Sequence, residues 1–365
     1  MRVLFYHTAR RWSGSARVFA AVAREMMRRG AQVTFVPSPE SSVEQRVAYD
    51  GYEVMPVDGG GPWMAESWRL RQVMLDRFVE VVFVHTEREH EVAAAATRWA
   101  ERGAVVRRTP AGAPLIVTRR SRLAMRLAAT NFVFTTQSEL QSAPTLKRAP
   151  EAVVADIGVD AATYDEVRPA SRQSLGVAAT GGHLIVCVYD PRAKARAALV
   201  MRTVALLAPR HPELRLALVG PGSDHEDLRM HAAALGLTNV VAHLGERDDQ
   251  LAVLRCADIG WVVADGDDAA YGVLDLMALR LPVLAERGSV AQRYVADGIT
   301  GILLPPGDVP ATAAIVASFL AHGDQRAAMG NAARVRVARD FAESSMVDRF
   351  ERAAEMARDR TKWIL

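Results

Sequence analysis

The chain has 365 residues, of which 50% are hydrophobic and 24% are charged, and its formal net charge is +3. This length favours two domains, because one hydrophobic core rarely serves more than about 250–300 residues. The small positive charge does not support nucleic-acid binding, although it allows a basic surface that faces acidic ligands or lipids.

Cysteine usage and hydropathy predict a cytoplasmic protein. Cys187 and Cys256 are the only cysteines, and each lies in an apolar stretch, which favours buried, reduced thiols over a disulfide. The N-terminal segment MRVLFYHTARRW lacks the long apolar stretch of a signal peptide, and no segment reaches membrane-spanning length.

Short β-rich segments alternate with longer segments of helical period along the chain. The predicted strands are residues 2–8, 32–38, 81–86, 104–110, 132–136, 184–190, 214–220, 240–245, 259–265 and 281–286. The clearest helix between them begins near Ala16 and stops at Gly30. Such alternation, with apolar strands, predicts parallel sheets joined by right-handed crossovers.

The alternation pauses once, in the polar, glycine-containing segment 160–183, and a new strand begins at Leu184. We therefore predict an α/β protein with two doubly wound domains of similar size and a cleft between them. The first domain covers residues 1–170 and the second covers residues 171–345. Open α/β sheets bind ligands at the carboxyl ends of their strands, so the loops at those ends are the candidate sites.

Two positions in the first half follow predicted strands. Gly14 opens a helix, where a ligand can approach the backbone and the unsatisfied N–H groups, although a plain strand–helix turn also explains it. His85 ends a strand, and its side chain is predicted either to enter the cleft or to bond to the backbone.

The second half contains a basic segment after its first strand. VYDPRAKAR carries Arg192, Lys194 and Arg196, which can hold a diphosphate and stabilise it as a leaving group. A solvated helix start is the alternative. The turns at Gly220 and Gly245 allow a flat ligand to pack against the main chain, but ordinary tight turns also account for them.

Two acids stand in the stretch DDAAYGVLDLMALRLPV. The pattern places Asp267 in a loop and Asp275 about one turn into the following helix. A carboxylate there can interact with the helix dipole, or it can accept hydrogen bonds from both hydroxyls of a ribose. Their spacing alone favours the capping role.

Taken in order, these segments resemble the retaining glycosyltransferases of the GT-B fold, and specifically glycosyltransferase family 4. SGSARVFAAVAREMMRRGAQV is similar to the family's GGAERVVLELARALARRGHEV, and IGVDAATYDEVRP is similar to NGVDxxxFxP. HPELRLALVGPGSDHEDL follows HPxxxLxxVGxGxxxxxL, and DGITGILLPPGD matches DGxTGLLVPPGD. The resemblance implies two Rossmann-like domains and a last helix, residues 346–365, that returns to the first domain.

The resemblance also implies the roles of individual residues. DDAAYGVLDLMALRLPV falls on the family motif EGFGLxxxEAMAxGxPV, so Asp267 and Asp275 stand at its two glutamates. Asp275 then binds the ribose of a nucleoside-diphosphate sugar, and Asp267 lies near the sugar and the diphosphate. The residues implied to be catalytic are Asp267, Arg192, Lys194 and His85. The residues implied to bind the donor are Gly14, Arg196, Gly220, Gly222, Gly245, Glu246, Val273, Leu274 and Asp275.

The sequence departs from the family pattern on the donor side. Both glutamates are aspartates, and the family's Gly-Phe-Gly is Asp268, Ala269 and Ala270. We predict a glycosyltransferase that retains anomeric configuration, requires no metal or cofactor, and uses a glycan, lipid or small-molecule hydroxyl as acceptor. The alternatives are a non-catalytic glycosyltransferase-like binding or partner protein and, less favoured, a sugar-nucleotide epimerase.

A basic stretch, RRSRLAMRLA, adds one further expectation. Its arginines, Arg119, Arg120, Arg122 and Arg126, lie along one predicted helix of the first domain. This helix either contacts anionic lipid at the membrane surface or presents a solvated face, and the solvated face is favoured.

Overall fold

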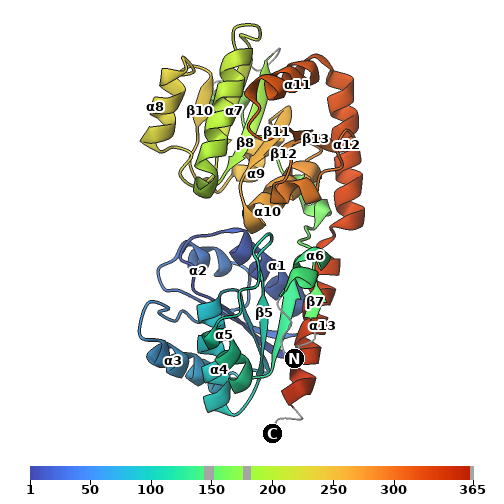
Figure 1. Cartoon of the computed structure of the whole chain (residues 1–365). Coiled ribbons are helices and arrows are strands. Elements are labelled where there is room, and N and C mark those ends of the chain that lie inside the picture. Colours follow the sequence, from blue (N-terminus) through green and yellow to red (C-terminus); the bar gives the residue numbers. More distant parts are fainter. Residues whose placement is uncertain (144–151, 176–181, 362–365) are drawn as a thin grey trace. The chain divides into compact units, whose positions relative to one another are not determined.

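The computed structural model of the chain describes residues 1–143, 152–175 and 182–361, and it divides into two compact units (Figure 1). Unit 1 comprises Met1–Ile157 and Glu343–Leu365, and unit 2 comprises Gly158–Ala342. The sequence places the boundaries after residues 170 and 345, whereas the contacts place them after residues 157 and 342. Each unit is a parallel sheet with helices packed against it, which confirms the predicted fold class.

Unit 1 has a sheet of seven parallel strands in the order β3-β2-β1-β4-β5-β6-β7. The strands are β1 (Arg2–His7), β2 (Gln32–Pro37), β3 (Glu53–Val54), β4 (Val81–Val84), β5 (Ala104–Arg108), β6 (Thr130–Phe134) and β7 (Ala152–Val154). The helices are α1 (Gly14–Arg28), α2 (Ser42–Val47), α3 (Trp63–Asp76), α4 (Glu87–Ala100), α5 (Arg119–Leu127), α6 (Gln137–Ser142) and α13 (Glu343–Thr361).

An aromatic cluster fills one side of the unit 1 sheet. The ring of Phe5 stacks on Phe83 at 4.7 Å and on Phe35 at 6.0 Å, so three neighbouring strands share one apolar layer. Phe19 of α1 meets Phe5 edge-on at 5.3 Å, and Phe350 of α13 lies 5.9 Å from Phe83. The last helix therefore belongs to the core of unit 1, although the chain reaches it only after unit 2.

Unit 2 has a sheet of six parallel strands in the order β10-β9-β8-β11-β12-β13. The strands are β8 (His183–Tyr189), β9 (Leu214–Val219), β10 (Val241–His243), β11 (Ile259–Val263), β12 (Val283–Glu286) and β13 (Gly301–Leu304). The α-helices are α7 (Lys194–Leu207), α8 (Glu226–Ala234), α9 (Gln250–Arg255), α10 (Gly266–Ala278), α11 (Val309–Ala321) and α12 (Gly323–Asp340). Among its described residues, unit 2 also has the short 3₁₀ helices η1 (Ala161–Glu166), η2 (Arg172–Leu175), η3 (Pro191–Ala193) and η4 (Val290–Arg293).

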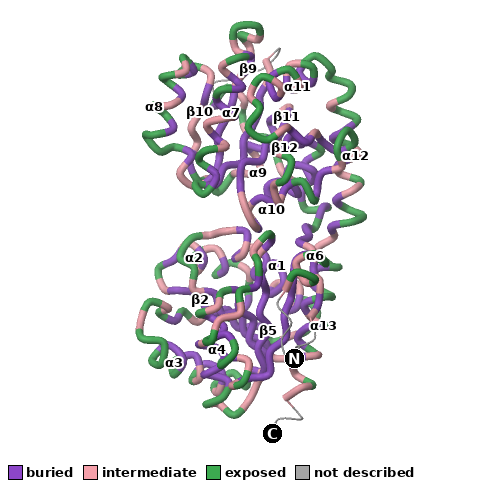
Figure 2. The backbone as a smooth tube through the Cα atoms, viewed as in Figure 1, coloured by how far each residue is buried: buried purple, intermediate pink, exposed green. Residues whose placement is uncertain are grey.

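Burial follows the layers of both units. Figure 2 shows buried strands inside each unit and exposed positions on the outer faces of the helices. Cys187 on β8 and Cys256 after α9 are buried free thiols, and burial raises the pKa of both. Within the described ranges, no helix is long and apolar enough to cross a membrane.

The strand orders locate one ligand-binding edge in each unit. The chain reverses its direction of travel across the sheet between β1 and β4 in unit 1, and between β8 and β11 in unit 2. Open α/β sheets bind ligands outside the carboxyl ends of the strands at such reversals. The loops after β1 and β4, and those after β8 and β11, are therefore the places to examine.

Candidate functional site

Main-chain hydrogen bonds in unit 2 join the carboxyl ends of four strands into one row. The Gly220 amide after β9 donates to the Gly245 carbonyl after β10 at 2.9 Å. The Asp190 amide after β8 donates to the Val263 carbonyl of β11 at 3.0 Å. Because β8 and β9 are themselves paired, the loops predicted to bind the donor lie side by side.

One glycine in this row, Gly220, is required by close backbone packing. A Cβ atom on Gly220, whose φ is +125°, would lie 2.3 Å from the Tyr189 carbonyl oxygen, so only glycine fits there. Ser223 fixes the neighbouring turn, since its hydroxyl accepts from the Gly245 amide at 2.9 Å and donates to the Leu218 carbonyl at 3.1 Å. Gly222 lies in the same turn, and Glu246 is exposed next to Gly245.

Helix α10 begins earlier than the sequence pattern suggests. The prediction that Asp267 precedes the helix is wrong, because α10 starts at Gly266 and Asp267 lies in its first turn. The following residues, Asp268, Ala269 and Ala270, suit a helix start, since acids favour the first turn and alanine is the strongest helix former. Asp267 is buried, with 3% of its surface exposed.

The three predicted diphosphate-binding cations are all paired with acids of unit 2. Arg192 contacts the Asp190 carboxylate at 2.5 Å and the Asp268 carboxylate at 2.8 Å. The hydrogen bond to Asp190 is the largest cause that raises the pKa of Arg192. The ion pair between the β8 loop and α10 lies at the point where the strand order reverses.

The other two cations have different surroundings. Lys194 pairs with Asp227 at 2.5 Å, and both side chains are exposed. Its hydrogen bond lowers the pKa of Asp227. Arg196 is more buried: it contacts the Asp265 carboxylate at 2.7 Å and donates to the Ala264 carbonyl at 3.1 Å. Arg192 and Arg196 thus reach the start of α10, whereas Lys194 contacts α8.

Asp275 lies deeper in the same helix. It is 1% exposed, and its Oδ1 accepts a hydrogen bond of 2.5 Å from the Tyr164 hydroxyl of η1. Val273 and Leu274 are fully buried, so their side chains pack inside unit 2. Asp275 lies eight positions after Asp267, which corresponds to about 12 Å along the helix axis.

Unit 1 has its own polar cluster between β1 and β4. His85 is 3% exposed, its Nε2 lies 2.8 Å from the Ser15 carbonyl, and its ring stacks on Phe19 at 3.6 Å. This is the backbone-bonded arrangement that the sequence leaves open. Gly14, the first residue of α1, is buried next to Ser15.

Glu89 organises this cluster, and sequence reasoning missed it. Its carboxylate accepts hydrogen bonds from the amides of Thr8, His85 and Thr86 and from the Thr8 hydroxyl, at 2.7–2.9 Å. His7 of β1 lies 3.8 Å from the same carboxylate, and its ring is 5.2 Å from that of His85. The Thr86–Glu89 spacing is that of a capping box, a sequence signal that identifies Glu89.

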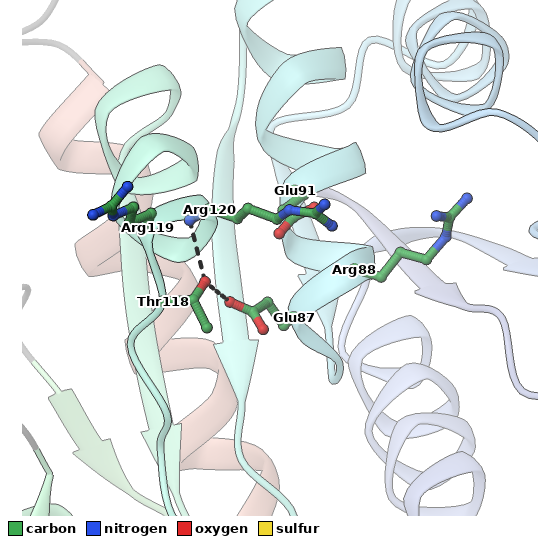
Figure 3. Close-up of a pocket in the computed structure, with 6 residues that line it drawn as sticks. All are labelled: Glu87, Arg88, Glu91, Thr118, Arg119 and Arg120. Carbon is green, nitrogen blue, oxygen red and sulfur yellow. Dashed lines mark hydrogen bonds between the residues drawn. The ribbon is translucent and has the colours of Figure 1, made fainter.

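A cavity of about 460 Å³ opens on unit 1 between the starts of α4 and α5 (Figure 3). It is lined by Glu87, Arg88, Glu91, Thr118, Arg119 and Arg120. The Arg119 and Arg88 side chains point away from each other, and Arg120 extends toward Glu91. Glu87 accepts a hydrogen bond from the Thr118 hydroxyl. The arginines thus do not converge on one point.

A family model matches the part of the chain that contains the row of loops in unit 2. Residues 174–336 match the family described as Glycosyl transferases group 1. The matched segment lies within unit 2 and covers less than half of the chain. It contains the paired cations and both acids of α10, whereas Tyr164 lies just before it.

Curated relatives match this chain over only part of their own length. The D-inositol 3-phosphate glycosyltransferase of Arthrobacter sp. (strain FB24) is 31% identical over 189 residues, which cover 49% of this chain and 44% of that relative. The aligned part of the chain therefore spans less than half the length of this relative.

Solved structures match nearly the whole chain, and so cover both units. Anabaena HepE in complex with UDP and glucose has a TM-score of 0.79 at 18% identity, with 97% of this chain and 99% of that one covered. A putative UDP-N-acetylglucosamine 2-epimerase from Listeria monocytogenes has a TM-score of 0.66 at 14% identity, with 99% and 97% covered. At these identities the likeness shows the fold alone, which HepE and the putative epimerase share.

Proposed function

We propose that the protein is a retaining glycosyltransferase that moves a sugar from a nucleoside-diphosphate sugar to an acceptor hydroxyl. The observation that carries the proposal is the arrangement at the β8–β11 reversal, where Arg192 and the first turn of α10 meet beside the buried Asp267. HepE, whose complex contains UDP and glucose, supports a uridine nucleotide as the first donor to test.

The diphosphate binds against Arg192 and the start of α10. The guanidinium and the unsatisfied N–H groups of a helix N-terminus both favour a negative charge that grows as the donor breaks. In the transfer, the bond between the anomeric carbon and the diphosphate oxygen breaks. The acceptor oxygen then bonds to the anomeric carbon on the same face and gives its proton to the departing phosphate. Since protein groups supply the positive charge, we propose that no metal is required.

The remaining predicted residues take supporting roles in this proposal. Asp275 binds the ribose hydroxyls, and the turns at Gly220, Gly222 and Gly245 hold the nucleotide against the main chain. Arg196 stabilises the loop that carries Asp265, since it contacts both the Asp265 carboxylate and the Ala264 carbonyl. The acceptor binds unit 1 at the carboxyl edge of its sheet, near Gly14 and His85.

Binding of the donor is tested with a calorimetric panel of UDP-, GDP-, ADP- and TDP-sugars. We expect saturable binding of one of these donors to wild type and no binding to Asp275→Ala. When an acceptor is supplied, transfer of the sugar should slowly release the nucleoside diphosphate as product. The matched control is Asp258→Ala, which removes a unit 2 acid that pairs with Arg172 at the other end of the sheet. Absence of binding to every donor contradicts the proposal.

The second candidate is a non-catalytic binding protein of the same fold. It is favoured by the pairing of all three cations with acids of unit 2, because a diphosphate must replace those carboxylates. Nucleotide binding without turnover of any donor, across a panel of glycan and polyol acceptors, would support this candidate. Conversion of the donor to an isomer without an acceptor would instead indicate an epimerase.

We also propose that α5 touches the anionic inner face of the membrane in a cytoplasmic protein. The helix exposes Arg122 and Arg126 beside Leu123, which is 56% exposed, and Ile116 nearby is 65% exposed. Such a mixture of cations and apolar side chains suits a lipid headgroup region. Co-sedimentation with phosphatidylglycerol vesicles should fall in Arg122→Glu/Arg126→Glu. Equal recovery with neutral vesicles contradicts recognition of an anionic headgroup, and no recovery with either vesicle shows that the face is merely solvated.

A further inference from the structure

The hydrogen bond between Tyr164 and Asp275 joins two segments that are distant in the chain. Tyr164 lies in η1 and is 3% exposed, and Asp275 lies in the third turn of α10 and is 1% exposed. The donor and acceptor oxygens are 2.5 Å apart. A bond of this length between a phenol and a carboxylate belongs to the strong, charge-assisted class.

The segment that carries Tyr164 is itself held in place. Arg255 at the end of α9 donates to the Tyr164 carbonyl at 2.9 Å. Arg334 of α12 donates to the Ala161 carbonyl and contacts the Asp165 carboxylate at 2.6 Å. Because two helices anchor η1, the phenol has a fixed position and its bond restricts the rotamer of Asp275.

Both partners stand where the sequence departs from the glycosyltransferase pattern. In the alignment of IGVDAATY with NGVDxxxF, Tyr164 takes the place of phenylalanine, and Asp275 takes the place of the second glutamate. Tyrosine adds one oxygen to phenylalanine, and aspartate removes one methylene from glutamate. Since these two changes touch in the structure, the added hydroxyl supports the shortened acid.

We propose that Tyr164 is a positioning residue, which orients the shortened Asp275 carboxylate toward the ribose hydroxyls of the donor nucleotide. The inference rests on the proposed function, because it assigns the ribose to Asp275. A carboxylate offers two oxygens and about four acceptor sites, so it accepts from the phenol and from ribose hydroxyls together. Tyr164 then acts through Asp275 and does not touch the sugar.

The experiment is a double-mutant cycle on the full chain. Wild type, Tyr164→Phe, Asp275→Glu and the combined variant are titrated by calorimetry with UDP, GDP, ADP and TDP. Tyr164→Phe should weaken binding of the preferred nucleotide about 10–100-fold, the range of one charge-assisted hydrogen bond. Asp275→Glu should weaken it too, since the longer side chain meets the phenol. The combined variant, which restores the family's pair, should bind within about threefold of wild type.

A second measurement separates positioning from a merely structural role. The affinities for the ribonucleotide and for its 2′-deoxy form are compared, since only an oriented Asp275 discriminates between them. Tyr164→Phe should shrink that ratio, and the combined variant should restore it. The control is Tyr294→Phe, which removes another buried phenol hydroxyl of unit 2 and should leave the ratio unchanged. Thermal denaturation of each variant reports folding.

The outcomes distinguish the two levels of the proposal. If wild type binds no nucleoside diphosphate, the proposed function and the role of Tyr164 both fail. If wild type binds, but Tyr164→Phe keeps its affinity and its ribose discrimination, the proposed function stands and the role of Tyr164 is wrong. The role of Tyr164 is equally wrong if the combined variant binds no better than the weaker single variant.

Discussion

Replacement of Glu89 by glutamine tests how unit 1 holds the carboxyl ends of β1 and β4 together. The Glu89 Oε1 accepts from the Thr8 amide at 2.7 Å and the Thr8 hydroxyl at 2.9 Å. Its Oε2 accepts from the amides of His85 at 2.9 Å and Thr86 at 2.8 Å. Glutamine has the same shape but offers one acceptor oxygen and one NH₂ donor.

The loss of unfolding free energy in Glu89→Gln follows from the more favourable of the two orientations of the glutamine side-chain amide. If the glutamine oxygen keeps the His85 and Thr86 amides, its NH₂ faces the Thr8 amide, and two donors oppose each other. One buried N–H without an acceptor costs about 1–3 kcal/mol, and two charge-assisted bonds that become neutral lose about 1 kcal/mol each. We therefore expect Glu89→Gln to lower the free energy of unfolding of unit 1 by about 3–5 kcal/mol.

Urea denaturation followed by tryptophan fluorescence measures this loss. Among the described tryptophans, Trp12, Trp63, Trp68 and Trp99 lie in unit 1 and only Trp261 lies in unit 2, so the signal reports mainly unit 1. With a slope of about 2–3 kcal/mol per M, the midpoint should fall by about 1–2 M.

Glu139 provides a matched control for Glu89. It occupies the same capping-box position at the start of α6 and accepts from the amides of Thr135 and Thr136 at 3.1 Å and of Gly112 at 2.7 Å. It is only half-buried, so water replaces a lost acceptor, and Glu139→Gln should cost about 1 kcal/mol or less. Equal midpoint shifts for the two variants would refute the argument from burial.

Three further changes probe unit 2 and the interior of unit 1. Asp268→Asn removes one negative carboxylate from beside Arg192. It should strengthen nucleotide binding by about 3–10-fold, because a negative charge near a bound diphosphate costs about 1 kcal/mol in a solvated site. Weaker binding of the variant in calorimetry would contradict this. Gly220→Ala places a Cβ atom 2.3 Å from the Tyr189 carbonyl oxygen. The free energy of unfolding of unit 2 should fall by at least about 2 kcal/mol, which lowers its Tm. An unchanged Tm would exclude the clash. Burial lowers the pKa of His90 from 6.5 to about 3, so below pH 6.5 the unfolded chain binds a proton that the folded unit does not, and stability falls as the pH drops toward 3. At pH 5 this loss is about 2 kcal/mol, and His90→Gln should remove most of it from the pH dependence of urea unfolding.

The alternation of strand and helix patterns in the sequence predicts most of the fold. Every strand predicted from apolar runs is present, and the parallel sheets follow from the helices between them. The edge strands β3, β7 and β13 lie outside the predicted set. The place of α13 in unit 1 depends on contacts such as Asn131 with the Ala353 carbonyl, 222 positions apart, which no local pattern encodes.

The candidate site is harder to predict because its contacts join separate loops. The basic run after β8 predicts an anion site from three cations, but apart from Asp190 the acids that pair with them are distant in the sequence. Asp268 is 76 positions from Arg192, and Asp227 is 33 positions from Lys194. A parallel sheet gathers the ends of non-consecutive strands at one edge, so charge balance there depends on strand order.

The residues that differ from the glycosyltransferase pattern contact other residues of the candidate site. These contacts help to decide whether the donor site is altered or lost. Counted along the sequence, Tyr164, Asp268 and Asp275 are separate substitutions. In the structure, Asp268 contacts Arg192 at 2.8 Å, and Tyr164 contacts Asp275 at 2.5 Å. Tyr164 and Asp275 are both buried, and a buried carboxylate that loses a hydrogen-bond partner is costly. This buried pair therefore favours a donor site that was rebuilt around a shorter acid over one that has decayed.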